Sequence, residues 1–207
     1  MYILSSMAMN ETQRAAAVFK KHGGILRTGQ ALAAGIHPRT LYRMRDEGTL
    51  EQLSRGVYRL ASMSDLEHPD LITVSVRTPG AVICLISALA YHEITTEIPH
   101  YVYLALPRGT KAPKIDHPPT RIFWFSGLAL TEGIQAHDLD GVWVKIYGPV
   151  KTVVDCFRLR NKIGTSVAVE ALNMCRYTFN SRPAEFLHYA RMCRVERVML
   201  PYLEASQ

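Results

Sequence analysis

Cysteine is scarce in this sequence, and its spacing argues against two classes of protein. The chain has four cysteines in 207 residues, and no two of them form a C-x-x-C pair. A disulfide-stapled secreted domain or a zinc-binding domain would need cysteines at regular, paired spacing. Because the cysteines lie mostly in apolar runs, we predict buried, reduced thiols, as in a cytoplasmic protein, at Cys84, Cys156, Cys175 and Cys193.

Long hydrophobic runs are also missing. No window approaches the roughly 20 apolar residues that a membrane-spanning helix needs, so we expect a soluble, cytoplasmic protein with no membrane partner. The apolar start at residues 1–4 is short and has no basic residues before it, which argues against a secretory signal peptide. Because Met1, Met7 and Met9 lie close together, translation could begin at any of the three.

The usual signatures of catalysis are absent as well. Six of the eight histidines lie beyond residue 62, yet none forms an H-x-x-x-H or H-E-x-x-H pair. No G-x-S-x-G motif, P-loop or dinucleotide-binding glycine pattern occurs. Lys145 lies in an apolar segment where a magnesium nuclease would need carboxylates, and Asp138 and Asp140 precede it in an expected turn. We therefore predict a protein that is not an enzyme and has no metal or cofactor.

Positive charge is present, and it is concentrated at one end. The net charge is +6. Residues 1–62 contain nine lysines and arginines against four acids, whereas the other 145 residues contain fifteen against fourteen. Such an asymmetry indicates an electrostatic surface for a polyanion in the first third of the chain, although solvated helix faces can also be basic.

The first 62 residues follow the order of a winged helix-turn-helix. Apolar residues recur at helical spacing in 11–21 and 28–34, and a third helix is expected from 37 to 47. Proline suits the first turn of that helix, and a glycine keeps the connection before it short. Two strands, at 50–53 and 57–60, flank a glycine-containing turn and would form the wing. We predict a DNA-binding domain at residues 1–62.

The rest of the chain, 63–207, is predicted to be a larger α+β domain with a helical C-terminal tail. Residues 61–70 are polar and could be a linker, and the pattern of 71–76 fits a strand or a helix end equally. β-branched and aromatic runs favour strands, and proline and glycine punctuate the chain between them. An apolar helix is expected at 79–92, strands at 101–106, 121–125 and 142–147, and tail helices at 149–160, 166–179, 183–193 and 195–203.

The third helix of the N-terminal domain has the composition of a DNA-reading helix. At 100° per residue Leu41 and Met44 share the face that would pack inward, and Arg39 and Arg43 lie opposite, with Thr40 and Tyr42 on the flanks. Arginine can pair with guanine in the major groove. Arg45 falls near the inward face, where its head group would extend outward to solvent.

Two further segments complete the expected DNA surface. An arginine at the turn of the wing could reach a phosphate or the minor groove, and polar residues open the second helix, where a phosphate often binds. The alternative is a solvated face on a structural or protein-binding module. The candidate DNA contacts are Arg27, Thr28, Gln30, Arg39, Thr40, Tyr42, Arg43 and Arg55.

Asp155, with Lys151 and Thr152, is the most conspicuous polar group of the second domain. We interpret it as structural rather than as a binding site, because an aspartate near a helix start favours the helix dipole and can tie down the preceding loop. The strand aromatics alternate between faces, so some must point outward. Those could be covered by the helical tail or could form an interface patch.

Three blocks of the sequence together resemble the AbiEi-type antitoxins of abortive-infection toxin–antitoxin systems. The first runs from Gly24 to Arg43 and closes on the segment Leu53-Ser54-Arg55-Gly56-Val57-Tyr58-Arg59-Leu60. The second comprises Ser87-Ala88-Leu89-Ala90-Tyr91-His92 and the segment Pro99-His100-Tyr101-Val102-Tyr103-Leu104-Ala105-Leu106-Pro107. The third is Gly148-Pro149-Val150-Lys151-Thr152-Val153-Val154-Asp155. The resemblance covers nearly the whole chain up to the helical tail.

The resemblance implies a two-part antitoxin and transcriptional autorepressor. The winged helix would bind double-stranded DNA at inverted repeats in its own promoter, through the third helix and the wing. The second domain would counteract a cognate nucleotidyltransferase toxin, with or without a stable complex. Two alternatives remain from the residues alone: a nuclease-like catalytic second domain, and a ligand-responsive repressor. Two monomers side by side on DNA and a preformed dimer are equally compatible with the sequence.

Overall fold

The first helix begins where the sequence offers a capping box. In the computed structural model, which describes residues 10–205, the Gln13 N–H donates to Asn10 Oδ1 (2.8 Å) and the Asn10 N–H donates to Gln13 Oε1 (2.9 Å). These bonds satisfy amides that a helix start leaves unpaired. Residues 10–62, which we call the N-terminal unit, form α1 (Glu11–Lys21), β1 (Ile25–Arg27), α2 (Thr28–Ala33), α3 (Pro38–Asp46), β2 (Leu50–Ser54) and β3 (Val57–Leu60).

The N-terminal unit has a three-stranded antiparallel sheet and its own core. The strand order is β1-β3-β2, and we call the β2–β3 hairpin the wing. Phe19, Leu41, Met44 and Leu60 are fully or almost fully buried between the helices and this sheet. The arrangement is consistent with the predicted winged helix-turn-helix.

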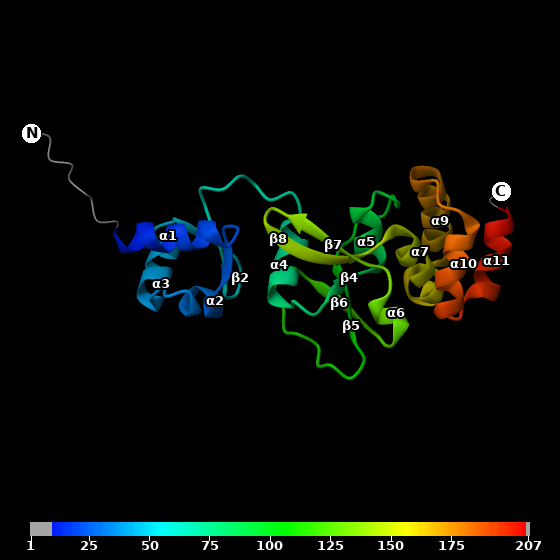
Figure 1. The fold of residues 1–207 in the computed structure, drawn as a ribbon, viewed down its shortest axis with the longest axis horizontal. Coiled ribbons are helices and arrows are strands. Elements are labelled where there is room, and N and C mark those ends of the chain that lie inside the picture. The colour runs from blue at the N-terminus through cyan, green and yellow to red at the C-terminus, as the bar shows by residue number, and fades with distance from the viewer. Residues whose placement is uncertain (1–9, 206–207) are drawn as a thin grey trace, which may run out of the picture.

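The C-terminal part, residues 69–205, is built around a five-stranded mixed sheet, so the chain as a whole is α+β (Figure 1). The strand order is β6-β5-β4-β8-β7, with β4–β8 and β5–β6 parallel and the other two pairs antiparallel. The elements before the tail are α4 (Pro69–Arg77), β4 (Val82–Ile83), α5 (Leu85–Tyr91), β5 (Val102–Pro107), β6 (Thr120–Phe125), α6 (Leu128–Thr131), β7 (Ile134–Leu139) and β8 (Val142–Tyr147).

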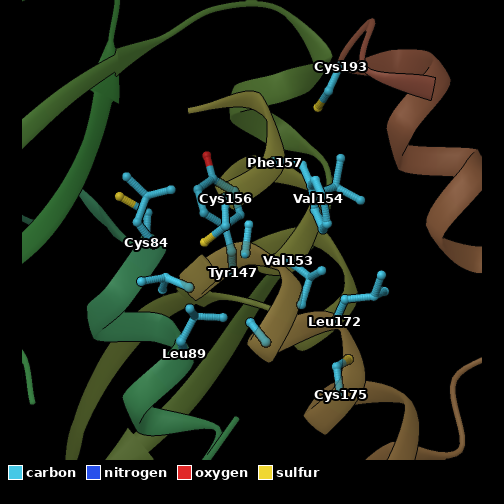
Figure 2. Close-up of a cluster of buried hydrophobic side chains, with 14 of the residues drawn as sticks. Cys84, Leu89, Tyr147, Val153, Val154, Cys156, Phe157, Leu172, Cys175 and Cys193 are labelled. Carbon is cyan, nitrogen blue, oxygen red and sulfur yellow. The ribbon is translucent and has the colours of Figure 1, made fainter. Parts of the chain in front are cut away.

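The two faces of the sheet bury different partners. On one face α4 packs with Ile72 and Val74, together with Ile25 and Val57 of the N-terminal unit. On the other face α5 and the tail helices cover a second core (Figure 2). The tail helices are α7 (Pro149–Arg158), α8 (Arg160–Ile163), α9 (Thr165–Phe179), α10 (Pro183–Met192) and α11 (Glu196–Ala205).

All four cysteines are free and buried, as predicted. Figure 2 shows Cys84, Cys156, Cys175 and Cys193 among apolar side chains of the core under the tail. Burial raises the pKa of each of these thiols, which keeps them protonated. Of the strand aromatics, Tyr103, Phe123, Phe125 and Tyr147 are buried in the core under the tail helices, whereas Trp143 is 70% exposed.

Several expected boundaries are wrong. The helix expected at 79–92 begins only at Leu85, because Val82 and Ile83 pair with β5 and β8 instead. Residues 71–76, which fitted either a strand or a helix end, belong to α4. The strand β7 was missed because it is an edge strand whose side chains are mostly exposed and polar. The three candidate start methionines, Met1, Met7 and Met9, lie outside the described residues.

The N-terminal unit and the sheet meet through two glycines. A Cβ added at Gly23 would lie 2.9 Å from the Gly141 carbonyl oxygen, and one added at Gly141 would lie 3.2 Å from the Gly23 Cα. Both residues have a positive φ, +73° and +82°, which side chains disfavour. The turn after α1 and the β7–β8 turn can therefore approach this closely only as glycines.

Candidate nucleic-acid interface

The α3 helix presents one apolar and one polar face. Leu41 and Met44 are buried against the core of the N-terminal unit, as predicted, while Arg39, Tyr42 and Arg43 are exposed. Pro38 starts the helix, and the Arg39 N–H donates to the His37 ring nitrogen Nδ1 (3.2 Å). The exposed face therefore begins with Arg39 in the first turn, which is where a helix in the major groove makes base contacts.

The two arginines of this face differ in their surroundings. No carboxylate of residues 10–205 lies within ion-pairing distance of Arg39. Arg43 instead reaches back to α1: its Nη2 donates to Thr12 Oγ1 (3.3 Å) and lies 3.5 Å from Glu11 Oε2. Its Nε is 4.0 Å from Glu47 Oε1, so Arg43 is held close to the surface of the helix.

Thr40 does not lie on an exposed flank, and this corrects the placement made from the helical wheel. It is 5% exposed, and its hydroxyl donates to Glu11 Oε2 (3.2 Å). The helical wheel was wrong here because α1 packs against this side of α3 and covers the short threonine. Tyr42, on the other flank, is 41% exposed and stacks under the Arg45 guanidinium (5.2 Å to the ring centroid).

The wing turn is tied to the start of α2. The Thr28 N–H donates to the Gly56 carbonyl (2.9 Å), and the Thr28 hydroxyl donates to the same oxygen (3.4 Å). The Gln30 side-chain carbonyl accepts the Arg27 N–H (2.9 Å). Thr28 and Gln30 thus have intramolecular partners, and their expected contacts with DNA stay predictions.

Arg27 and Arg55 are the exposed cations at this junction. Both have exposed side chains, and within the described part of the chain neither forms an ion pair. Two other arginines of the N-terminal unit are engaged internally: Arg45 pairs with Asp46 (2.7 Å), and Arg59 is buried against Glu51 (3.1 Å). At the start of α2, on α3 and on the wing, the cations available to a polyanion are therefore Arg27, Arg39 and Arg55, with Arg43 partly neutralised. Arg14, Lys20 and Lys21 of α1 are exposed as well.

The polar group around Asp155 is buried in the core under the tail. Asp155 Oδ2 lies 2.5 Å from Lys151 Nζ, and Oδ1 lies 3.1 Å from Arg158 Nη2. Burial raises the pKa of Asp155, and the two cations oppose that rise. Lys151 Nζ also donates to the Ala129 carbonyl (3.1 Å).

The expected means by which Asp155 stabilises the helix is wrong. Asp155 binds side chains of α7 itself and caps no helix end, because it lies in the middle of that helix. The preceding loop is instead tied down by Thr152, whose hydroxyl donates to the Tyr147 carbonyl (3.0 Å) and the Gly148 carbonyl (2.9 Å). With Lys151 1% and Asp155 0% exposed, this group is enclosed in the core.

Three histidines that are far apart in the sequence come together around one tyrosine. The rings of His68, His92 and His137 lie 5.2, 5.2 and 4.9 Å from that of Tyr91. Burial lowers the pKa of His92 and of His137. Among residues 10–205 no group of three histidine, cysteine or acidic side chains has an arrangement that could hold a metal ion. Sequence reasoning missed this cluster because only the fold brings the three positions together.

Comparison with known proteins supports the N-terminal assignment. Residues 13–61 match the family model described as "Transcriptional regulator, AbiEi antitoxin". This segment is the N-terminal unit with its three helices and wing, so the resemblance to AbiEi-type antitoxins is confirmed there. No curated protein matches the chain.

The whole fold has a solved counterpart. The crystal structure of the RV2827C protein from Mycobacterium tuberculosis is similar, with a TM-score of 0.58 and 14% sequence identity. The match covers 95% of this chain and 82% of that one, so it extends over both the N-terminal unit and the C-terminal part. At this identity the likeness concerns the fold. In the described residues no helix combines the length and the apolarity needed to cross a membrane.

Proposed function

We propose that this protein is an antitoxin and transcriptional autorepressor that binds operator DNA in its own promoter through α3 and the wing. The observation that carries the proposal is that the elements that would meet DNA in the family-matched unit carry exposed arginines without an ion pair: Arg39 on α3, Arg55 on the wing and Arg27 at the start of α2. Guanidinium groups without an internal carboxylate partner can exchange water and counterions for phosphates or guanine edges at little cost.

The surroundings of each arginine suggest a division of roles. Arg39, in the first turn of α3, would contact base edges in the major groove. Arg43 would follow it, released in part from Glu11, and Tyr42 would assist at the backbone. Arg55 and Arg27 would contact phosphates beside the wing. Thr40, buried against Glu11, would position α1 rather than touch DNA.

The experiment is fluorescence anisotropy with the region upstream of the gene and with a scrambled duplex. Arg39→Ala should weaken binding to the specific site by about 5- to 150-fold, the equivalent of about 1–3 kcal/mol, and should weaken binding to scrambled DNA less. Arg55→Ala should weaken both duplexes alike and reduce the salt dependence. The control is Lys20→Ala, which removes an exposed cation from α1. An equal loss for Arg39→Ala on both duplexes would contradict base reading.

The antitoxin half of the proposal concerns the C-terminal part. That part would counteract a cognate nucleotidyltransferase toxin encoded nearby, and the family match of the N-terminal unit supports this assignment. Expression of the toxin alone should arrest cell growth, and co-expression of this protein with the toxin should restore growth. Full rescue by the Arg39→Ala/Arg55→Ala variant would separate neutralisation from DNA binding, and no rescue by the wild-type protein would contradict the antitoxin role.

A further inference from the structure

The loop between β5 and β6, residues 108–119, follows a fixed course beside the wing. At its start the Arg108 N–H donates to the Phe125 carbonyl (2.8 Å), and the Trp124 indole Nε1 donates to the Thr110 carbonyl (2.9 Å). Further along, Ile115 packs against the core that contains α4. These anchors hold the loop against the molecule, so its exposed side chains have defined positions.

A single guanidinium joins this loop to the wing. Arg77, at the end of α4, donates from Nη2 to the Lys114 carbonyl (2.8 Å) and from Nη1 to the Arg55 carbonyl. The backbone of Lys114 therefore lies immediately beside the wing turn. In Figure 1 the loop, drawn in green, runs below α4 on the side of the molecule where α2 lies.

The loop extends the basic character of the wing. Arg108, Lys111 and Lys114 are exposed, and none of them forms an ion pair with residues 10–205. Asp116 is the one acid between 108 and 119. Lys114 adjoins Arg55 through Arg77, so it adds a cation next to the wing, and Lys111 lies three residues before it in the same loop.

A DNA duplex is the partner that fits this group of cations. It carries one negative charge per about 1.7 Å of its axis, so a protein surface that runs past the wing meets further phosphates. The exposed side chains of the loop include Arg108, Lys111 and Lys114 against the single acid Asp116, a charge balance that suits a polyanion. Its rigid attachment to the wing turn means that DNA held at Arg55 lies near Lys114.

We propose that residues 108–119 form a second contact of this protein with DNA, in which Lys111 and Lys114 bind backbone phosphates of the same duplex next to those bound by the wing. The inference rests on the proposed function, because it places the wing on DNA. It assigns part of the DNA footprint to the C-terminal part, with Arg77 as the residue that positions the loop.

The test is the salt dependence of operator binding by the full-length Lys111→Gln/Lys114→Gln variant. Both side chains are exposed and the bond to Arg77 uses a backbone carbonyl, so the change leaves the anchors intact. The matched control is Arg194→Gln/Arg197→Gln, which removes two exposed cations from the C-terminal helical end, far from the N-terminal unit in Figure 1.

Loss of two phosphate contacts lowers the slope of log Kd against log salt by about 1.8, at roughly 0.9 per phosphate. The affinity ratio of wild type to variant should then fall about tenfold between 50 and 200 mM salt. Hydroxyl-radical footprints should lose protection at the sugars flanking the wing. The control variant should keep the wild-type slope and footprint.

The outcomes separate this inference from the proposed function. If the wild-type protein fails to bind its upstream region at all, the proposed function fails. If the wild type binds and the loop variant shows an unchanged slope and footprint, only the loop assignment is overturned. If that variant keeps its DNA binding but no longer binds polyglutamate, the loop would instead be a binding site for an acidic protein.

Discussion

Replacing Asp155 with alanine removes the carboxylate that holds Lys151 and Arg158 in the core under the tail helices. Arg158 has a side chain that is 21% exposed and can rotate toward water. Lys151, at 1%, cannot, and it keeps the Ala129 carbonyl and the faces of Tyr147 and Phe125, whose ring centroids lie 4.2 and 5.5 Å from its Nζ. The substitution therefore destabilises the protein mainly because it leaves the Lys151 ammonium group buried without a carboxylate partner.

The loss of one partner from a buried ion pair costs about 3–5 kcal/mol. For a protein of this size that corresponds to a fall in Tm of about 6–20 °C, at roughly 2–4 °C per kcal/mol. A Lys151→Met/Asp155→Leu variant removes both buried charges. It should lose less stability than Asp155→Ala, although it changes more atoms, because no lysine is left unpaired in the core.

Urea unfolding followed by tryptophan fluorescence measures this directly. Both tryptophans, Trp124 and Trp143, lie in the C-terminal part, so the signal reports on the region that contains Asp155. Two results would refute the reasoning: an Asp155→Ala variant within about 1 kcal/mol of wild type, or a double variant less stable than the single one. Operator affinity of the folded variants should stay at the wild-type value, since Asp155 lies in the core, away from α3 and the wing.

Two further predictions concern the glycine contact and the histidine cluster. Gly141→Ala should weaken the contact between the N-terminal unit and the sheet by about 1–3 kcal/mol, because the new Cβ would lie 3.2 Å from the Gly23 Cα at a φ of +82°. Limited proteolysis of the connecting residues 61–68 should then become faster. The control Gly80→Ala, whose new Cβ has no heavy atom within 4 Å, should be cleaved at the wild-type rate. Burial lowers the pKa of His92, so below about pH 6.5 the unfolded chain binds a proton that the folded protein excludes. As the pH is lowered through this range, the free energy of unfolding decreases by up to about 1.4 kcal/mol per pH unit. His92→Gln should reduce this slope in urea titrations between pH 7.5 and 5.5, and an identical slope would show that His92 is not responsible.

Local pattern predicted the N-terminal unit well because its signals are short-range. Proline before Arg39, glycines at the turns and the spacing of Leu41 and Met44 specify helix ends and faces within a few residues. The burial of Thr40 and the pairing of Arg43 with Glu11 depend on how α1 crosses α3, which no periodicity in α3 encodes.

The C-terminal part was harder to predict for the same physical reason. The two-residue strand Val82–Ile83 is a strand only because β5 and β8 lie on either side of it, and β7 has the polar sequence of a solvated edge. The cluster around Tyr91 and the loop beside the wing depend on contacts between segments distant in the chain. The sequence nevertheless predicted the buried cysteines, because they lie mostly in apolar runs of the chain that become part of the core.

The most direct test of the central claim is the affinity of the wild-type protein for its own upstream region, measured beside a scrambled duplex of equal length at 150 mM salt. A sequence-specific repressor should prefer its operator by about a thousandfold or more, and an inverted repeat should accommodate two N-terminal units. Equal affinity for the two duplexes, or no binding to either at 50 mM salt, would contradict the assignment of α3 and the wing as a DNA-reading surface.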